Sequence, residues 1–98
     1  MTVSGRAGGT VCRMPVISRF LGIRIHMYHR EHGVPHFHAV YAEHRVSVEV
    51  ESGVVRGTFP QRALRQVLEW AALRTAELMA NWEQARQGNP IRRIAPLE

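Results

Sequence analysis

A chain of 98 residues, 45% of them hydrophobic, is long enough for one domain with its own core and too apolar to be an intrinsically disordered protein. Its formal charge of +5 comes from thirteen arginines and eight glutamates, with no lysine or aspartate. Arginine binds phosphate groups in a bidentate manner, but an arginine-only sequence is also what a GC-rich genome produces, so charge alone does not identify a nucleic-acid-binding protein.

Two absences in the sequence point to a cytoplasmic protein without a membrane partner. No apolar run approaches the roughly 18 residues that a membrane helix needs. The lone cysteine, Cys12, cannot form an internal disulfide, which favours a reducing compartment. Residues 1–13 show no hydrophobic period, and we expect them to be a disordered N-terminal extension to a single domain at residues 14–98.

The first half of the domain is predicted to form β-strands. Residues 22–28 alternate between apolar and polar side chains, with Ile23, Ile25 and Met27 on one side, as a half-buried strand requires. Residues 29–35 are polar and indicate a loop. Further strands are expected at residues 37–41, 45–51 and, as a short edge strand, 54–58.

The second half of the domain is predicted to be helical. Pro60 indicates a helix start, because a proline in the first turn loses no hydrogen bond. Apolar residues recur at helical spacing through residues 61–87. We expect a bend or break near Arg74-Thr75, with Thr75 capping a second helix. Gly88 indicates the helix end, and the tail at residues 91–97 should pack back on the domain.

This order of elements predicts an α+β fold: a small antiparallel sheet of three to four strands, then one long bent helix or two C-terminal helices packed on one face. Trp70 and Trp82 are expected in the core or at a partner interface. In the predicted core, one set of sheet residues faces one set of helix residues: Ile23, Ile25, Val46, Val48 and Val50 against Leu64, Val67, Leu68 and Ala71.

All six histidines lie within residues 26–44, and any chemistry of this chain is expected there. His36 and His38 are two positions apart, so a strand places them on one face. One interpretation is a metal site, in which His36, His38 and Glu43 hold zinc or another divalent transition metal ion.

A second interpretation is acid–base chemistry without a cofactor. A ribonuclease that uses the RNA 2′-hydroxyl needs a base, an acid and cations around the phosphate. His32, His36 and His38 are the candidate catalytic residues. The candidate contacts to phosphate or to a partner are Arg24, His26, Tyr28, Tyr41 and Arg45. A third interpretation is structural: the histidines stack on Phe37, Tyr41 and the helices and only hold the loop.

Short segments along the chain resemble the bacterial family called "domain of unknown function 4160". The resemblance runs from Met14 to Glu98 and rests on residues 14–20, 27–28, 35–39, 62–64, 68–71, 81–83 and 96–97. One departure is Val34, where the family loop has the first proline of Pro-Pro-His-Phe-His. The resemblance implies a small cytosolic prokaryotic protein whose gene is often paired with a second small gene in toxin–antitoxin style, and it implies no established reaction.

The family resemblance, the excess of arginine and the clustered histidines together favour a toxin–antitoxin-type component that binds a small cognate protein encoded nearby and RNA. A histidine-rich metal-binding module or small metalloenzyme is the alternative from another class, and an interaction domain without catalysis is the third. The sequence leaves open whether the chain is an enzyme and whether it forms a homodimer.

Overall fold

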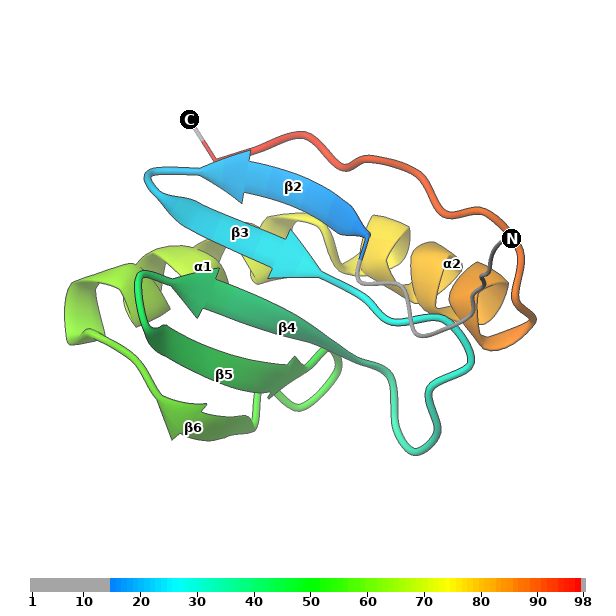
Figure 1. The fold of residues 1–98 in the computed structure, drawn as a ribbon, viewed down its shortest axis with the longest axis horizontal. Helices are drawn as coiled ribbons and strands as arrows, with labels where there is room; N and C mark the ends of the chain where they lie inside the picture. The colour runs from blue at the N-terminus through cyan, green and yellow to red at the C-terminus, as the bar shows by residue number, and fades with distance from the viewer. Residues whose placement is uncertain (1–14, 98) are drawn as a thin grey trace, which may run out of the picture.

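The computed structural model describes residues 15–97, which form an antiparallel sheet followed by two helices. The strands are β2 (Val16–Phe20), β3 (Ile23–His26), β4 (His36–Tyr41), β5 (His44–Glu49) and β6 (Val55–Thr58), and the helices are α1 (Gln61–Leu73) and α2 (Thr75–Arg86). Each strand pairs with the next in the chain, and both helices lie behind the sheet in Figure 1. The predicted α+β class with helices on one face is confirmed, whereas the predicted extension at residues 1–13 lies outside the described residues.

The sheet has five strands rather than three or four, because β2 is not visible in the sequence pattern. Its register shifts between Val16 and Ser18, so Ile17 and Ser18 are both buried and the polar–apolar alternation is lost. The turn to β3 also lacks a typical signal. Leu21 and Gly22 both have positive φ angles, 53° and 80°, which a two-residue hairpin turn requires but which leucine rarely adopts.

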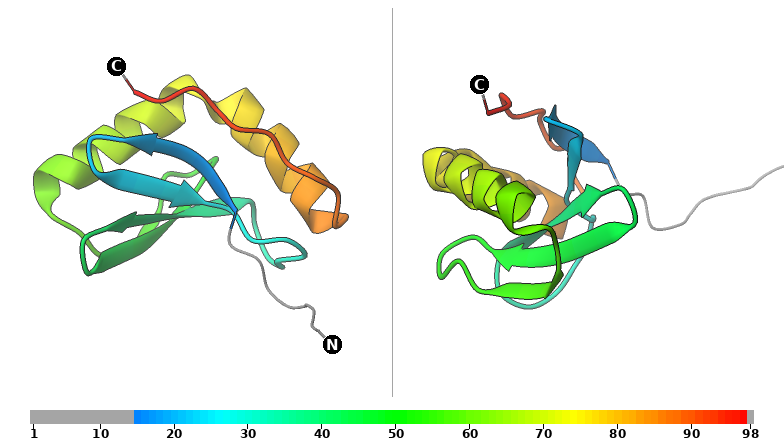
Figure 2. Two further views of the ribbon diagram at one scale, coloured as in Figure 1. Left: turned by 45° about the horizontal axis from the view of Figure 1, so that its top comes forward. Right: turned by 90° about the vertical axis from the view of Figure 1, so that its left-hand side faces the viewer.

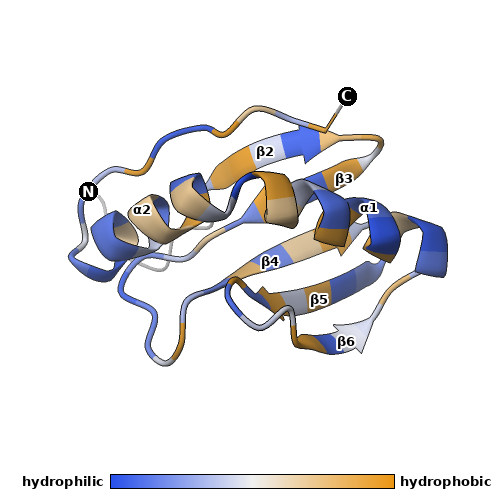
Figure 3. Cartoon of the chain, turned by 180° about the vertical axis from the view of Figure 1, so that it is seen from behind, coloured by the Kyte–Doolittle hydropathy of each residue, from blue (hydrophilic) through white to orange (hydrophobic). Residues whose placement is uncertain are grey.

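The core is centred on Trp70, which is fully buried between two phenylalanines. Its ring centroid lies 5.4 Å from that of Phe20 and 5.7 Å from that of Phe37. All five predicted sheet residues of the core are buried. On α1 the prediction was partly wrong: Leu64 and Leu68 are only half-buried, and Ala63 and Trp70 are buried beside the predicted Val67 and Ala71. Figure 3 shows α1 with hydrophilic residues interleaved among apolar ones, as expected for a helix buried on one side.

The predicted break between the helices is confirmed at Arg74, but the predicted cap is wrong. The Arg74 backbone leaves the helical region, with φ −118° and ψ 22°. The Arg74 N–H still donates to the Trp70 carbonyl of α1 at 3.1 Å, and the Arg74 carbonyl accepts the Leu78 N–H at 2.9 Å as the first bond of α2. Thr75 therefore lies inside the first turn of α2, and its hydroxyl donates back to the Ala71 carbonyl at 3.0 Å. Among residues 15–97, no helix is long and apolar enough to cross a bilayer.

The C-terminal segment packs back as predicted and runs beside β2 (Figure 2). The Ile94 N–H donates to the Ile17 carbonyl at 2.7 Å, and the Trp70 indole N–H donates to the Ala95 carbonyl at 2.8 Å. Asn81 on α2 makes two bonds to one residue: its Nδ2 donates to the Arg92 carbonyl at 2.7 Å, and its Oδ1 accepts the Arg92 N–H at 3.0 Å.

Replacing Asn81 by alanine should therefore destabilise the fold. The substitution removes two part-buried hydrogen bonds to the backbone of Arg92, and a hydrogen bond of this kind contributes about 0.5–1.5 kcal/mol to stability. Urea unfolding of Asn81→Ala should show this loss in the free energy of unfolding. The control is Asn89→Ala, because the exposed Asn89 side chain bonds only to two glutamine side chains. Equal stability of the two variants would contradict the prediction.

Candidate functional site

Glu31, His36 and His38 converge where the β3–β4 loop meets the start of β4. The Glu31 Oε2 atom lies 3.1 Å from the His36 Nε2 atom, and the Glu31 Oε1 atom lies 3.2 Å from the His38 Nε2 atom. One ligand atom from each side chain lies within 4.8 Å of the others. One carboxylate thus faces the distal nitrogens of two imidazoles.

Strand alternation places the two histidines. Phe37 between them is fully buried against Trp70, so the side chains before and after it must point to the other face of β4. His26 on β3 is the cross-strand partner of His38 and is also buried.

The loop places Glu31. The backbone of the loop is bonded to the end of α2 at the residue before Glu31, where the Arg30 N–H donates to the Ala85 carbonyl at 2.7 Å. The His29 ring adds a hydrogen bond to the Asn89 carbonyl at 3.1 Å. Arg30 has a φ angle of 59°, a left-handed conformation that is uncommon for arginine and that turns the chain just before Glu31.

Two aromatic side chains hold the imidazole rings. The Trp82 ring of α2 lies 5.0 Å from the His36 ring, and the Tyr28 ring lies 4.3 Å from the His38 ring, measured between centroids. The side chains of His36, His38 and Glu31 remain 15%, 21% and 27% exposed. The cluster is therefore restrained by its neighbours and still accessible to a small ion or to water.

Hydrogen bonding fixes which nitrogen of His36 is available. Its Nδ1 atom lies 2.8 Å from the Val34 carbonyl oxygen. Since a carbonyl can only accept, Nδ1 carries the hydrogen, and in the neutral ring the lone pair is on Nε2. The Nε2 atom lies 3.1 Å from the Glu31 Oε2 atom, which is close enough for an ion pair when His36 carries a second proton or for a cation bound by both groups.

The environment of His38 favours its neutral form. Burial of its ring lowers the pKa of His38 below the usual 6.5. The hydrogen bond and the charge of Glu31 oppose this shift, and the nearby rings of His36 and His26 add to it. His38 is therefore mostly neutral at pH 7, the form that binds metals or accepts a proton.

The distances in the cluster are those of direct hydrogen bonds or ion pairs, and they are also compatible with a metal ion held by the same three side chains. Bonds from zinc to histidine nitrogen or carboxylate oxygen are about 2.0–2.2 Å long. Two such ligands at an angle of about 90–109° around one ion lie about 3.0–3.4 Å apart, and the two N–O distances here are 3.1 and 3.2 Å. Two histidines and one carboxylate would leave coordination positions open for water or substrate.

The structure brings together His36 and His38 but not the other residues predicted to act with them. Glu43 lies in the turn at the opposite end of β4, where its side chain is 84% exposed and 3.8 Å from His44. His32 follows Glu31 in the loop and is exposed.

The predicted contact residues lie in three different places, and His26, described above, is buried beside His38. Arg24 and Arg45 are exposed on the sheet face away from the helices, on either side of Val40. Tyr28 stacks on His38 at the cluster. Tyr41 instead packs against the core, with its ring centroid 6.1 Å from that of Phe59.

Glu31 and Trp82 were not identified from the sequence. The signal available for Glu31 was that it is one of only two acidic residues within the histidine segment at residues 26–44. Choosing it over Glu43 depends on how the loop folds back, which has no periodic pattern. Trp82 stacks on His36 across 46 positions of sequence (82 − 36), a contact that only the tertiary fold creates.

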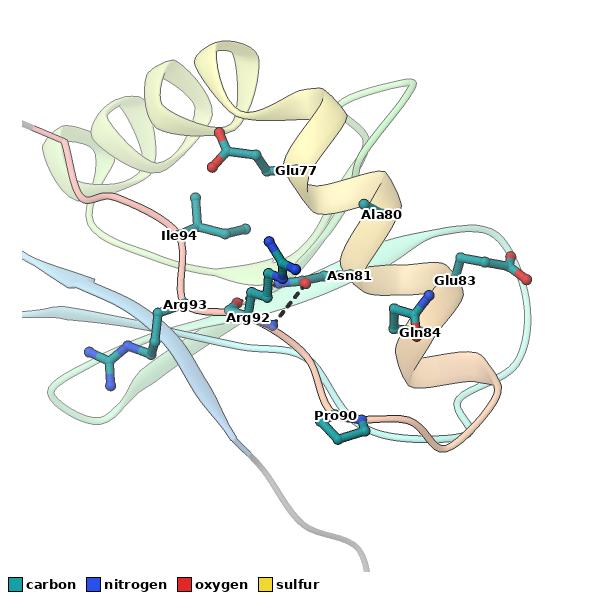
Figure 4. A pocket seen from close by; sticks show the side chains of 9 residues that line it. All are labelled: Glu77, Ala80, Asn81, Glu83, Gln84, Pro90, Arg92, Arg93 and Ile94. Atoms are coloured by element: carbon teal, nitrogen blue, oxygen red, sulfur yellow. Dashed lines mark hydrogen bonds between the residues drawn. The ribbon is translucent and has the colours of Figure 1, made fainter.

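Away from the cluster, a hollow of about 890 Å³ lies between α2 and the C-terminal segment (Figure 4). Its volume suits a small molecule. It is lined by the carboxylates of Glu77 and Glu83 and by Arg92 and Arg93, with no histidine or cysteine. The Asn81 amide in its wall is already bonded to Arg92. The groove therefore has no group suited to general-base or metal chemistry at neutral pH other than exposed carboxylates.

A family model described as "Domain of unknown function (DUF4160)" matches residues 22–83, which is more than half of the chain and includes the whole cluster. Comparisons with curated proteins and with solved structures found no match. The chain belongs to the family described as "Domain of unknown function (DUF4160)".

Proposed function

We propose that the chain is a metal-binding module in which Glu31, His36 and His38 hold one divalent transition metal ion. The observation that supports this most directly is the convergence of the three side chains, because one ligand atom from each lies within 4.8 Å of the others. The two N–O distances, 3.1 and 3.2 Å, are compatible with ligands on one ion. The Val34 carbonyl supports it further, since a bond to Nδ1 is the usual way in which a metal-binding histidine is oriented. Imidazole and carboxylate together favour zinc or ferrous iron.

Charge argues for a cation and against the metal-independent ribonuclease. In such an enzyme the two histidines would flank a phosphodiester, which is negatively charged. Here the negative carboxylate of Glu31 stands between the two Nε2 atoms and would repel a phosphate at that position. The same carboxylate would attract a metal ion.

Metal uptake tests the proposal. Protein purified without a histidine tag, stripped with a chelator and titrated with Zn²⁺ should bind one ion per chain by calorimetry. Glu31→Gln, His36→Gln and His38→Gln each remove a ligand. Each should weaken binding by more than the roughly 10- to 100-fold that is typical of changes to groups that only orient ligands.

The matched control is His44→Gln, which removes an imidazole of the same segment that lies at the start of β5, outside the cluster. It should leave zinc affinity unchanged. Sub-stoichiometric binding by the unmodified protein, or an equal loss in His44→Gln, would contradict the proposal and favour the interpretation that the histidines only hold the loop.

The lowered pKa of His38 predicts a pH dependence of stability in the metal-free protein. The unfolded chain takes up a proton on His38 near pH 6.5, whereas the folded chain does so only at lower pH. The contribution of His38 to stability should be complete above about pH 6.5 and decline as the pH falls toward the folded pKa. Thermal melts between pH 7.5 and 5 should show this decline, and His38→Gln should reduce it. An unchanged slope in His38→Gln would refute the assignment.

A second candidate is the toxin–antitoxin-type component that binds a small partner protein and RNA. It is supported by the net positive charge and by the exposed Arg24 and Arg45, neither of which has a carboxylate partner within residues 15–97. Assays of RNA cleavage with and without EDTA separate the two candidates. Cleavage that persists in EDTA and disappears in the His36→Gln/His38→Gln double variant would support the metal-independent enzyme. We expect no cleavage in EDTA.

A further inference from the structure

Arginines from four strands share the sheet face that the helices leave open. The register aligns Arg19, Arg24, Val40 and Arg45 in one row across β2, β3, β4 and β5. Arg56 on β6 lies on the same face, because its cross-strand partner Ser47 is two residues after Arg45 on β5. Both helices lie behind the sheet in Figure 1 and in front of it in Figure 3, so within residues 15–97 no helix covers these arginines.

The charge of this face is largely uncompensated. Arg19, Arg24 and Arg45 are exposed, and none forms an ion pair with a carboxylate in the part of the chain that the structure describes. Arg56 is paired with Glu49, but at 3.5 Å and with a side chain that is 72% exposed. These guanidinium groups are therefore available to an anionic ligand.

Val40 indicates how the row is organised. It lies on the open face and yet is only 6% exposed. Its cross-strand neighbours are Arg24 and Arg45, which lie on either side of it on this face. Long side chains at such positions can cover an apolar neighbour with their aliphatic parts while their charged ends stay in solvent, which lowers the entropy that a ligand must overcome to order them.

We propose that this face binds the phosphate backbone of a single-stranded nucleic acid. Neighbouring strands are about 4.8 Å apart, so the backbones of Arg24 and Arg45 lie about 10 Å from each other across β4. Arginine binds phosphate oxygens in a bidentate manner, and a row of arginines follows a chain of phosphates.

Tyr28 favours a single strand over a duplex. It stacks on His38 at the cluster end of this face and is half-buried, so part of its ring remains accessible. Unpaired bases stack on such rings, whereas bases inside a duplex are already stacked on each other. The proposal deepens the RNA-binding candidate and does not depend on a bound metal.

The test is fluorescence anisotropy with labelled single-stranded RNA and DNA of about 12 nucleotides and one sequence, titrated with the full chain in EDTA at several salt concentrations. Each phosphate contact contributes about 0.7 to the slope of log K against log salt for single strands. Arg24→Gln/Arg45→Gln should therefore weaken binding and reduce this slope by about 1.4.

The matched control is Arg62→Gln/Arg65→Gln, which removes the same charge from two exposed positions on α1. It should keep the slope close to that of the unmodified protein. Tighter binding of RNA than of DNA would identify RNA as the ligand. Equal binding would show that the protein recognises the phosphate backbone that both share, and either result supports the proposal. Equal losses in the two double variants, tighter binding to duplex, or no binding to either single strand would overturn it.

Failure of this proposal is distinguishable from failure of the metal site. Arg24→Gln/Arg45→Gln should bind zinc as the unmodified protein does, because neither arginine belongs to the cluster. Conversely, His36→Gln should bind the oligonucleotide in EDTA with an unchanged salt slope.

Discussion

The burial of Phe37 is the constraint on which the histidine cluster depends. Its ring is fully enclosed and contacts Trp70, the central side chain of the core, with centroids 5.7 Å apart. Because side chains alternate along a strand, this anchor directs His36 and His38 to one side and spaces them two residues apart. A site that projects from a strand whose other face is packed in the core is held more rigidly than one carried by a loop alone.

The third member, Glu31, comes from a loop, and its precision depends on α2. The backbone bond from Arg30 to Ala85 and the stacking of Trp82 on His36 both join the loop side of the cluster to that helix. The helix is held in turn by the C-terminal segment, which Asn81 binds through both its amide atoms. The cluster thus depends on contacts between segments far apart in the sequence, and a change in the tail can reach it through α2.

The sequence predicted what periodic patterns encode. Alternation identified β3 and β5 and the pair His36 and His38, and helical spacing identified the helical half of the chain. The break at Arg74 was expected because one straight helix over residues 61–87 would be too long for so small a domain. It did not predict β2, where a bulge buries Ile17 and Ser18 together and removes the alternation. Nor did it identify Glu31, because a loop with a left-handed residue at Arg30 has no period from which the direction of the next side chain follows. Glu43, equally near in sequence, lies at the other end of β4.

A metal at the cluster and arginines on the same sheet face would together bind an anionic ligand, since a bound cation offsets the charge of Glu31 that otherwise repels phosphate. The central claim is the metal site, and anomalous diffraction from crystals grown with Zn²⁺ tests it most directly. We predict one anomalous peak at the zinc edge about 2.0–2.2 Å from Glu31, His36 Nε2 and His38 Nε2. A well-ordered cluster without a peak, or a peak only at other residues, would contradict the account.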